Sequence, residues 1–241
     1  MALGLNPTEE SGKNNAISLT FDAGEFDFQG QHGQTYTIPI AGGFKINERV
    51  RLDYEIPLQY ITLDRTALFQ GGLTLDLPVK VIIPSVDRPW SWIVTPTAAF
   101  ASSGSREIIG GGALTNVLAY QWHGITATYG NYISFFEGEV LTSNDPKFPT
   151  GVSQQIMKNG LRLDVPIGKS WIVEGYGIYT QFFQPAAVGS YVTFGAEVGY
   201  HFAWNVEGQN IDFGYLSLGM YSEIGNRYSS GHVQIGSAWR F

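Results

Sequence analysis

Apolar and polar residues alternate along most of this chain, over runs long enough to restrict how it can fold. In 49–63, every second residue from Val50 to Tyr60 is apolar or aromatic, and mostly charged or amide side chains lie between them. The segments 72–79 and 191–202 show the same alternation. Because successive side chains of a β-strand point to opposite faces, each run predicts a strand with one apolar and one polar face. Long segments with helical periodicity are not found.

The expected strands are long. Many run 12 to 15 residues, whereas a strand of a globular sheet usually has about 5 or 6. A tilted strand that crosses a membrane needs about 9 to 11 residues in the hydrocarbon, plus extensions into water. Twelve strands are predicted, and an even number brings both chain ends to one side of a closed barrel. Their expected ranges are 16–28, 33–44, 48–61, 66–80, 91–103, 108–121, 124–138, 153–166, 171–184, 189–203, 210–224 and 229–241.

The predicted fold is therefore all-β: a transmembrane, antiparallel, up-and-down β-barrel of about 12 strands, with both termini periplasmic. A single barrel covers 16–241, after a polar N-terminal segment at 1–15. That segment has no basic and apolar leader, so a signal peptide is absent or has been removed. The alternative is a soluble β-sandwich or lipocalin-like barrel, whose apolar face would point inward. Strand length and aromatic content favour the membrane barrel.

Composition excludes several classes of function. Charged residues make up 15% of the chain, against about 25% in an ordinary soluble domain. The net charge of -7 and the lack of a basic cluster argue against a nucleic-acid partner. Cysteine is absent, and no His, Asp and Glu spacing suits a metal, so neither a cofactor nor a metal site is expected. No apolar run reaches the roughly 18 to 20 residues of a transmembrane helix.

The six tryptophans orient the predicted barrel. On the strand map they all fall at the end that carries the C-terminus, whereas ordinary core tryptophans would be scattered along the strands. Aromatic side chains with a polar N–H suit the membrane interface. Connections at this end are short, whereas 138–153 at the other end is long, and short turns are typical of the periplasmic side. The predicted aromatic girdle, on the periplasmic side, is Trp90, Trp92, Trp122, Trp171, Trp204 and Trp239.

The chain ends in the strand pattern "QIGSAWRF". Gln234 is followed by Gly236, and aromatic residues occupy the third-last and last positions as Trp239 and Phe241. This motif resembles the C-terminal β-signal of bacterial outer-membrane β-barrel proteins. The resemblance covers eight residues, and the strand pattern extends the class over about 16–241. It implies an integral protein of the bacterial outer membrane, recognised by the barrel-assembly machinery through Gln234, Gly236, Trp239 and Phe241.

Charged residues on the polar faces predict the lining of a pore. An internal repeat, "GLTLDLPV" at 72–79 and "GLRLDVPI" at 160–167, helps to assign the faces, as does a recurring "SWIV". Five basic and six acidic side chains nearly cancel, so weak ion selectivity is expected. They could also pair only with each other, because an unpaired buried charge is costly. The candidates are Arg51, Asp53, Glu55, Asp76, Lys80, Lys158, Arg162, Asp164, Glu174, Glu197 and Arg240.

The leading hypothesis for function is an outer-membrane channel for passive diffusion of small solutes through a narrow, mixed-charge lumen. A non-conducting structural or adhesive barrel is the main alternative. A lipid hydrolase or acyltransferase would need Ser and His near the outer leaflet; His32, His232, Ser229 and Ser230 lie at that end, without a recognisable spacing. An autotransporter translocator would need a helix through the lumen, for which 1–15 is unsuited. The expected partners are outer-membrane lipids, the assembly machinery and small solutes, and the protein is expected to be a monomer.

Overall fold

The computed structural model describes residues 16–63, 66–81, 89–103, 107–140, 151–183, 189–206 and 209–240. Within these ranges the chain forms thirteen strands, and no helix there could span a membrane. The strands are β1 (Ala16–Phe28), β2 (Gln31–Lys45), β3 (Arg51–Leu63), β4 (Thr66–Asp76), β5 (Val79–Val81), β6 (Trp90–Ser103), β7 (Glu107–Trp122), β8 (Ile125–Val140), β9 (Gly151–Ile167), β10 (Trp171–Phe182), β11 (Ser190–Val206), β12 (Gln209–Gly225) and β13 (Tyr228–Arg240).

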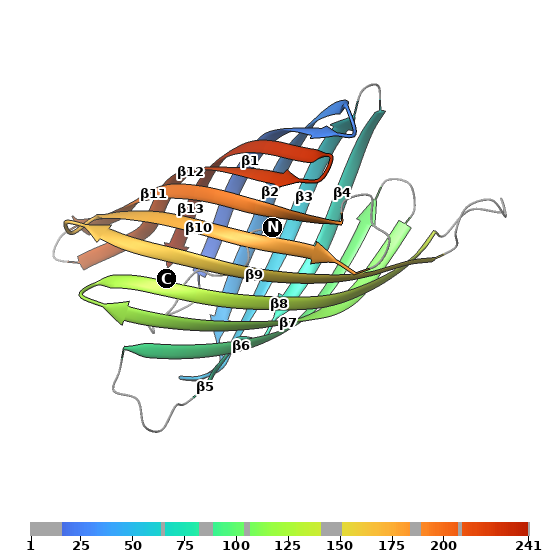
Figure 1. Ribbon diagram of the computed structural model, residues 1–241. Helices are drawn as coiled ribbons and strands as arrows, with labels where there is room; N and C mark the ends of the chain where they lie inside the picture. The colour runs from blue at the N-terminus through green and yellow to red at the C-terminus, as the bar shows by residue number, and fades with distance from the viewer. Residues whose placement is uncertain are drawn as a thin grey trace.

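All of these strands belong to one antiparallel sheet that closes on itself. Apart from β4 and β5, which do not pair with each other, each strand pairs with its neighbours in sequence. β1 pairs with β13 along its whole length, from Ala16 opposite Arg240 to Phe28 opposite Tyr228. Figure 1 shows the blue first strand beside the red last one. The ring is completed where β4 pairs with β6. Since β4 and β5 follow each other along β6, the barrel has twelve strand positions. The predicted all-β, closed antiparallel barrel is confirmed, and the periplasmic side of the termini stays a prediction.

The fourth predicted strand, 66–80, is divided into β4 and β5 at Leu77 and Pro78. Proline has no backbone N–H, so one bond of the ladder is missing there. The neighbouring backbone bonds remain: Leu77 N donates to the Pro96 carbonyl at 2.9 Å, and the Pro78 carbonyl accepts from Arg51 N at 3.1 Å. The register is unchanged across the break, because Asp76 lies opposite Thr97 and Val79 lies opposite Val94.

Tight turns occur at both ends of the barrel. Gln29 and Gly30 join β1 to β2 with φ values of 55° and 82°, and His123 and Gly124 join β7 to β8 with 47° and 84°. Two residues with positive φ give a turn whose twist matches that of the paired strands. The connection expected at 28–33 is therefore only a two-residue turn. The longer connection between β8 and β9 lies largely outside the described residues.

The distribution of polar and apolar side chains is the reverse of that in a soluble barrel. Among the described residues, only Ala119 and Ile178 are buried hydrophobic residues, whereas nine polar or charged residues are buried. Large apolar side chains point outward instead, and Leu161 is 64% exposed. A soluble protein rarely leaves large contiguous apolar areas in water. The polar interior and apolar exterior are the arrangement of a barrel surrounded by lipid.

Candidate pore lining

Strand register and exposure place most of the predicted pore-lining residues on the inner face. These side chains are half-buried or buried, while their sequence neighbours on the outer face are mostly more exposed. Lys80 holds an inner register position in β5 but is exposed, and the side chain of Arg240 lies outside the described residues. The nine others on the inner face are Arg51, Asp53, Glu55, Asp76, Lys158, Arg162, Asp164, Glu174 and Glu197.

Three carboxylates form a row across β9, β10 and β11. Glu174 is paired directly with Asp164 on one side and with Glu197 on the other. Arg162 contacts two of them: its Nε lies 2.5 Å from an Asp164 oxygen, and its Nη2 lies 2.6 Å from Glu174 Oε2. Glu197 accepts a hydrogen bond of 2.8 Å from Gln234 Nε2. The row thus has more negative than positive charge.

A second charged group lies on β3 and β4. Arg51 Nε is 2.5 Å from Asp53 Oδ1, and Asp53 is paired directly with Asp76. The hydroxyl of Thr97 donates to Asp76. Glu55 is two residues from Asp53 on the same face of β3. Here too, carboxylates outnumber the arginine that neutralises them.

The two charged groups face each other across the lumen. Along the ring, β3 and β10 are six positions apart in either direction, through β2, β1, β13, β12 and β11 or through β4, β6, β7, β8 and β9. Both groups lie toward the end of the barrel at which β3 and β10 begin. A solute that passes through the barrel would therefore have charged side chains on opposite walls.

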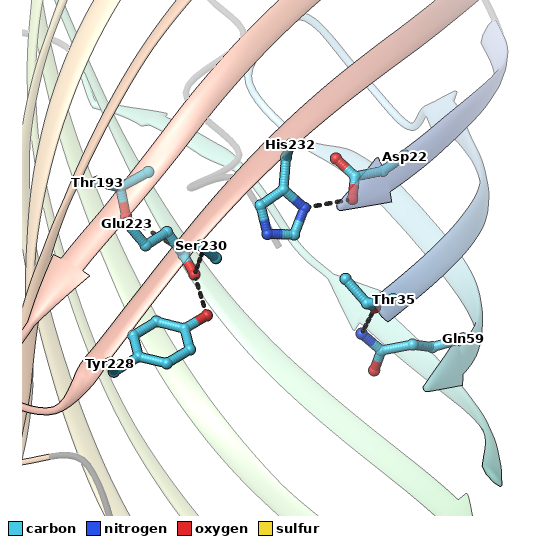
Figure 2. A network of polar contacts seen from close by, with 8 residues as sticks. All are labelled: Asp22, Thr35, Gln59, Thr193, Glu223, Tyr228, Ser230 and His232. Atoms are coloured by element: carbon cyan, nitrogen blue, oxygen red, sulfur yellow. Dashed lines mark hydrogen bonds and ion pairs between the residues drawn. The ribbon is translucent and has the colours of Figure 1, made fainter. Parts of the chain in front are cut away.

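Sequence reasoning missed three further inner residues: Asp22, Glu223 and His232 (Figure 2). His232 Nδ1 lies 2.9 Å from Asp22 Oδ1, and the imidazole stacks on Tyr221 with ring centroids 4.3 Å apart. The alternation pattern could have placed Asp22 and Glu223 on the inner face, because their neighbours Phe21 and Ile224 are apolar and point outward.

Glu223 is the centre of a hydrogen-bond cluster near the other end of the barrel. Its Oε2 accepts from the hydroxyl of Tyr228 at 2.6 Å and from Ser230 at 3.1 Å, and its Oε1 accepts from Thr193 at 3.4 Å (Figure 2). Lys158 on β9 also lies inside, 5.7 Å from the centre of the Tyr132 ring. With Asp22 and Glu223 included, the inner face of the described strands is more acidic than the predicted balance of five basic to six acidic residues.

Ser229 is exposed on β13, and the three other residues considered for catalysis contact other groups. Ser230 donates to Glu223. His232 interacts with Asp22, and His32 Nδ1 lies 3.2 Å from Asp27 Oδ2. A nucleophilic serine needs a base within hydrogen-bond reach, and neither histidine has that contact with Ser230 in these pairings.

The tryptophans with described side chains, Trp90, Trp92, Trp122 and Trp171, are all exposed on the outer face. They occupy the start of β6, the end of β7 and the start of β10, which meet at one end of the barrel. Trp204 and Trp239 belong to β11 and β13, and their side chains lie outside the described residues. The girdle itself stays a prediction, as does its periplasmic side.

The motif at the C-terminus lies on β13, the strand that closes the barrel. Gln234 and Gly236 are on its inner face, where Gly236 is buried. Phe241 lies outside the described residues. The interpretation of this motif as an assembly signal remains a prediction.

Comparison with known proteins supports the fold. No protein family model matches the chain, and no curated protein sequence matches it. Among solved structures, the translocator domain of the autotransporter NalP from Neisseria meningitidis is similar, with a TM-score of 0.64 and 10% identity over 96% of this chain and 90% of that one. An outer-membrane channel from Pseudomonas putida F1 has a TM-score of 0.61 and 9% identity over 95% and 96% of the two chains.

The NanC porin is also similar, with a TM-score of 0.55 and 8% identity over 92% of this chain and 99% of that one. At such low identity, similarity carries information on the fold alone. All three structures cover nearly the whole barrel, and two are channels by name. The twelve-stranded closed barrel of this chain is therefore similar in fold to solved outer-membrane barrels.

Proposed function

We propose that this protein is an integral outer-membrane channel, through which small solutes diffuse passively along a narrow lumen of mixed charge. The observation that carries the proposal is the pair of charged groups on opposite inner walls, around Glu174 and around Asp53. Two of the contacts that hold these groups lie within one strand, and the other three join strands that are adjacent or separated by a single strand. Between described residues, these contacts run along one wall of the lumen rather than across it.

The barrel size indicates small solutes. An eight-stranded barrel is nearly filled by its own side chains, whereas 16 to 18 strands leave a wide aqueous channel. Twelve strands lie between these limits, so the conductance should be low. Because carboxylates outnumber basic groups on the inner face, cations should enter more readily than anions of the same size.

Recordings from purified protein in planar bilayers test this proposal. We expect small, stepwise conductance and, under a salt gradient, a reversal potential on the cation side. The matched variants are Glu174→Gln, inside, and Glu137→Gln, on the outer face of β8. Both replace a carboxyl group with a neutral amide, but only Glu174→Gln should reduce cation preference. If the protein neither conducts nor admits solutes into liposomes, the channel hypothesis is wrong, and a non-conducting structural barrel replaces it.

A further inference from the structure

Three asparagines form a row on the outer face of the barrel, where apolar residues are expected. Asn116 on β7 is paired directly with Asn131 on β8, which is paired directly with Asn159 on β9. Their sequence neighbours on the same face are strongly exposed, including Ile133 at 60% and Leu161 at 64%. The three side chains therefore point away from the lumen.

Hydrogen bonds connect this row sideways. Asn116 Nδ2 lies 3.4 Å from Asn131 Oδ1, and Asn131 Nδ2 donates to Asn159 Oδ1 at 2.6 Å. Trp92 Nε1 donates to Asn116 Oδ1, and Asn131 Nδ2 also lies 2.9 Å from the hydroxyl oxygen of Tyr129. Within the described part of the chain, the amide nitrogen of Asn159 donates no hydrogen bond. The row thus ends in a donor that no described residue satisfies.

The asparagine row lies near the middle of the three strands, between two rows of apolar side chains. Asn159 is the ninth of 17 residues in β9, and Asn116 and Asn131 lie within two residues of the middle of their strands. One apolar row, Leu114–Ile133–Met157, lies on one side of the asparagines. A second row, Leu118–Tyr129–Leu161, lies on the other side.

At its β7 end the row contacts Trp92 of the predicted interfacial girdle, and from there it extends to the middle of β9, where a polar side chain is poorly matched to hydrocarbon. Lipid tails offer no hydrogen-bonding groups, so amides there need protein partners. Between transmembrane segments, amide side chains are used to hold one segment against another. On β12, by contrast, the outward residues Leu216, Leu218 and Met220 are all apolar. The polar row is therefore a local feature of one side of the barrel.

We propose that this side of the barrel, the outer face of β7, β8 and β9, binds a second copy of the same chain and forms a two-fold dimer in the membrane. This departs from the expected monomer, and it rests on the proposed membrane position but not on conduction. In a two-fold dimer of copies inserted in the same direction, the axis must run along the membrane normal. That axis preserves depth, so the asparagine row of one copy meets that of the other.

Side-chain chemistry favours a second copy as the partner. A primary amide is both donor and acceptor, so the row is complementary to itself, as a two-fold contact requires. The neighbouring strand β10 has glycine at two outward positions, and nothing within 4 Å would contact a Cβ at Gly175. Gly175 is paired directly with the exposed Leu163, so this leaves space beside Leu163 for a side chain of the other copy. A polar residue within an apolar contact also fixes its register.

Thiol cross-linking tests which face of the barrel meets the other copy. Because the chain has no cysteine, each introduced cysteine is the only thiol that can react. Ile133→Cys places a single thiol beside the row, and Leu218→Cys places one on the outer face of β12 with similar exposure, 57% against 60%. A short bis-maleimide applied to membranes should link Ile133→Cys into dimers and leave Leu218→Cys monomeric. Equal linking of both variants, or of Leu218→Cys alone, would overturn the proposal.

The oligomeric state of variants tests whether the asparagine amides hold the dimer together. Native mass spectrometry in mild detergent should show a dimer for the wild-type chain and mainly monomer for Asn131→Leu. Ser222→Leu makes a comparable polar-to-apolar change on the outer face of β12 and should stay dimeric. If Asn131→Leu fails to fold, the cross-linking result decides. A wild-type monomer at every protein concentration, or a dimer that Asn131→Leu leaves intact, means that the row does not hold two copies together.

Discussion

Glu174 and Glu197 lie directly opposite each other across β10 and β11, with Asp164 directly on the other side of Glu174. Like charges in such positions repel each other and destabilise a sheet. The row is held by Arg162 and Gln234, which together supply one positive charge for three carboxylates. The repulsion between the three carboxylates is therefore only partly compensated.

This relationship predicts that Glu197→Gln stabilises the barrel slightly and weakens its preference for cations. The amide keeps a hydrogen bond with Gln234 but removes the repulsion from Glu174, a gain of about 0.2 to 1 kcal/mol. Urea unfolding in lipid vesicles, followed by tryptophan fluorescence, measures the first effect, and the reversal potential measures the second. A less stable variant with unchanged selectivity would show that Glu197 has another role.

Arg162→Gln should act in the opposite direction. Arg162 is 12% exposed and contacts both Asp164 and Glu174. Removing one partner of a buried ion pair leaves the other charge uncompensated, at a cost of about 3 to 5 kcal/mol. We expect lower resistance to urea and a stronger preference for cations, which salt should weaken because screening shortens to about 3 Å at 1 M.

The double variant Arg162→Gln/Glu174→Gln provides the control. It removes the positive charge together with one of the carboxylates that depend on it, so it should recover a substantial part of the lost stability. If the double variant is no more stable than Arg162→Gln alone, the Arg162 side chain contributes through packing instead of through its charge.

The third prediction compares a residue on the lipid-facing side of β12 with its neighbour on the lumen side. Leu218 points outward near the middle of β12, and its neighbour Ser217 points inward. Leu218→Arg should destabilise the folded barrel by about 2 to 4 kcal/mol in vesicles, because it places a charge at the membrane midplane. Ser217→Arg should be much milder. Equal loss of stability in the two variants would contradict the proposed position in the membrane.

Alternation predicted the strands, and strand length, aromatic content and the C-terminal motif distinguished a membrane barrel from a soluble one. Eleven of the twelve expected ranges each correspond to one strand, and the exception, 66–80, is divided where Pro78 cannot donate to the ladder. The same period-two pattern predicted the inner face of Arg162 and Glu174, because a closed barrel keeps every second side chain on one side.

What the sequence could not supply is the relation between strands. Asp164, Glu174 and Glu197 are far apart in sequence, and only strand register brings them into one row. The same is true of Asn116, Asn131 and Asn159, each of which is unremarkable in its own strand. The pairing of Asp22 with His232 requires closure of the barrel, which joins the first strand to the last. Register depends on turns and bulges whose geometry alternation does not encode.

The last prediction concerns the end of the chain. Since β13 pairs with β1 to close the barrel, and the motif from Gln234 to Phe241 resembles an assembly signal, deleting Phe241 should slow insertion without changing synthesis. Less protein should reach the outer membrane, and less of it should resist unfolding by heat in detergent. Trp122→Ala removes an exposed aromatic ring outside the motif and serves as the control. If the shortened chain reaches the membrane at the wild-type level and resists heat equally well, the terminal aromatic residue is not read during assembly, and β13 closes the barrel through its backbone pairing with β1 and β12 alone.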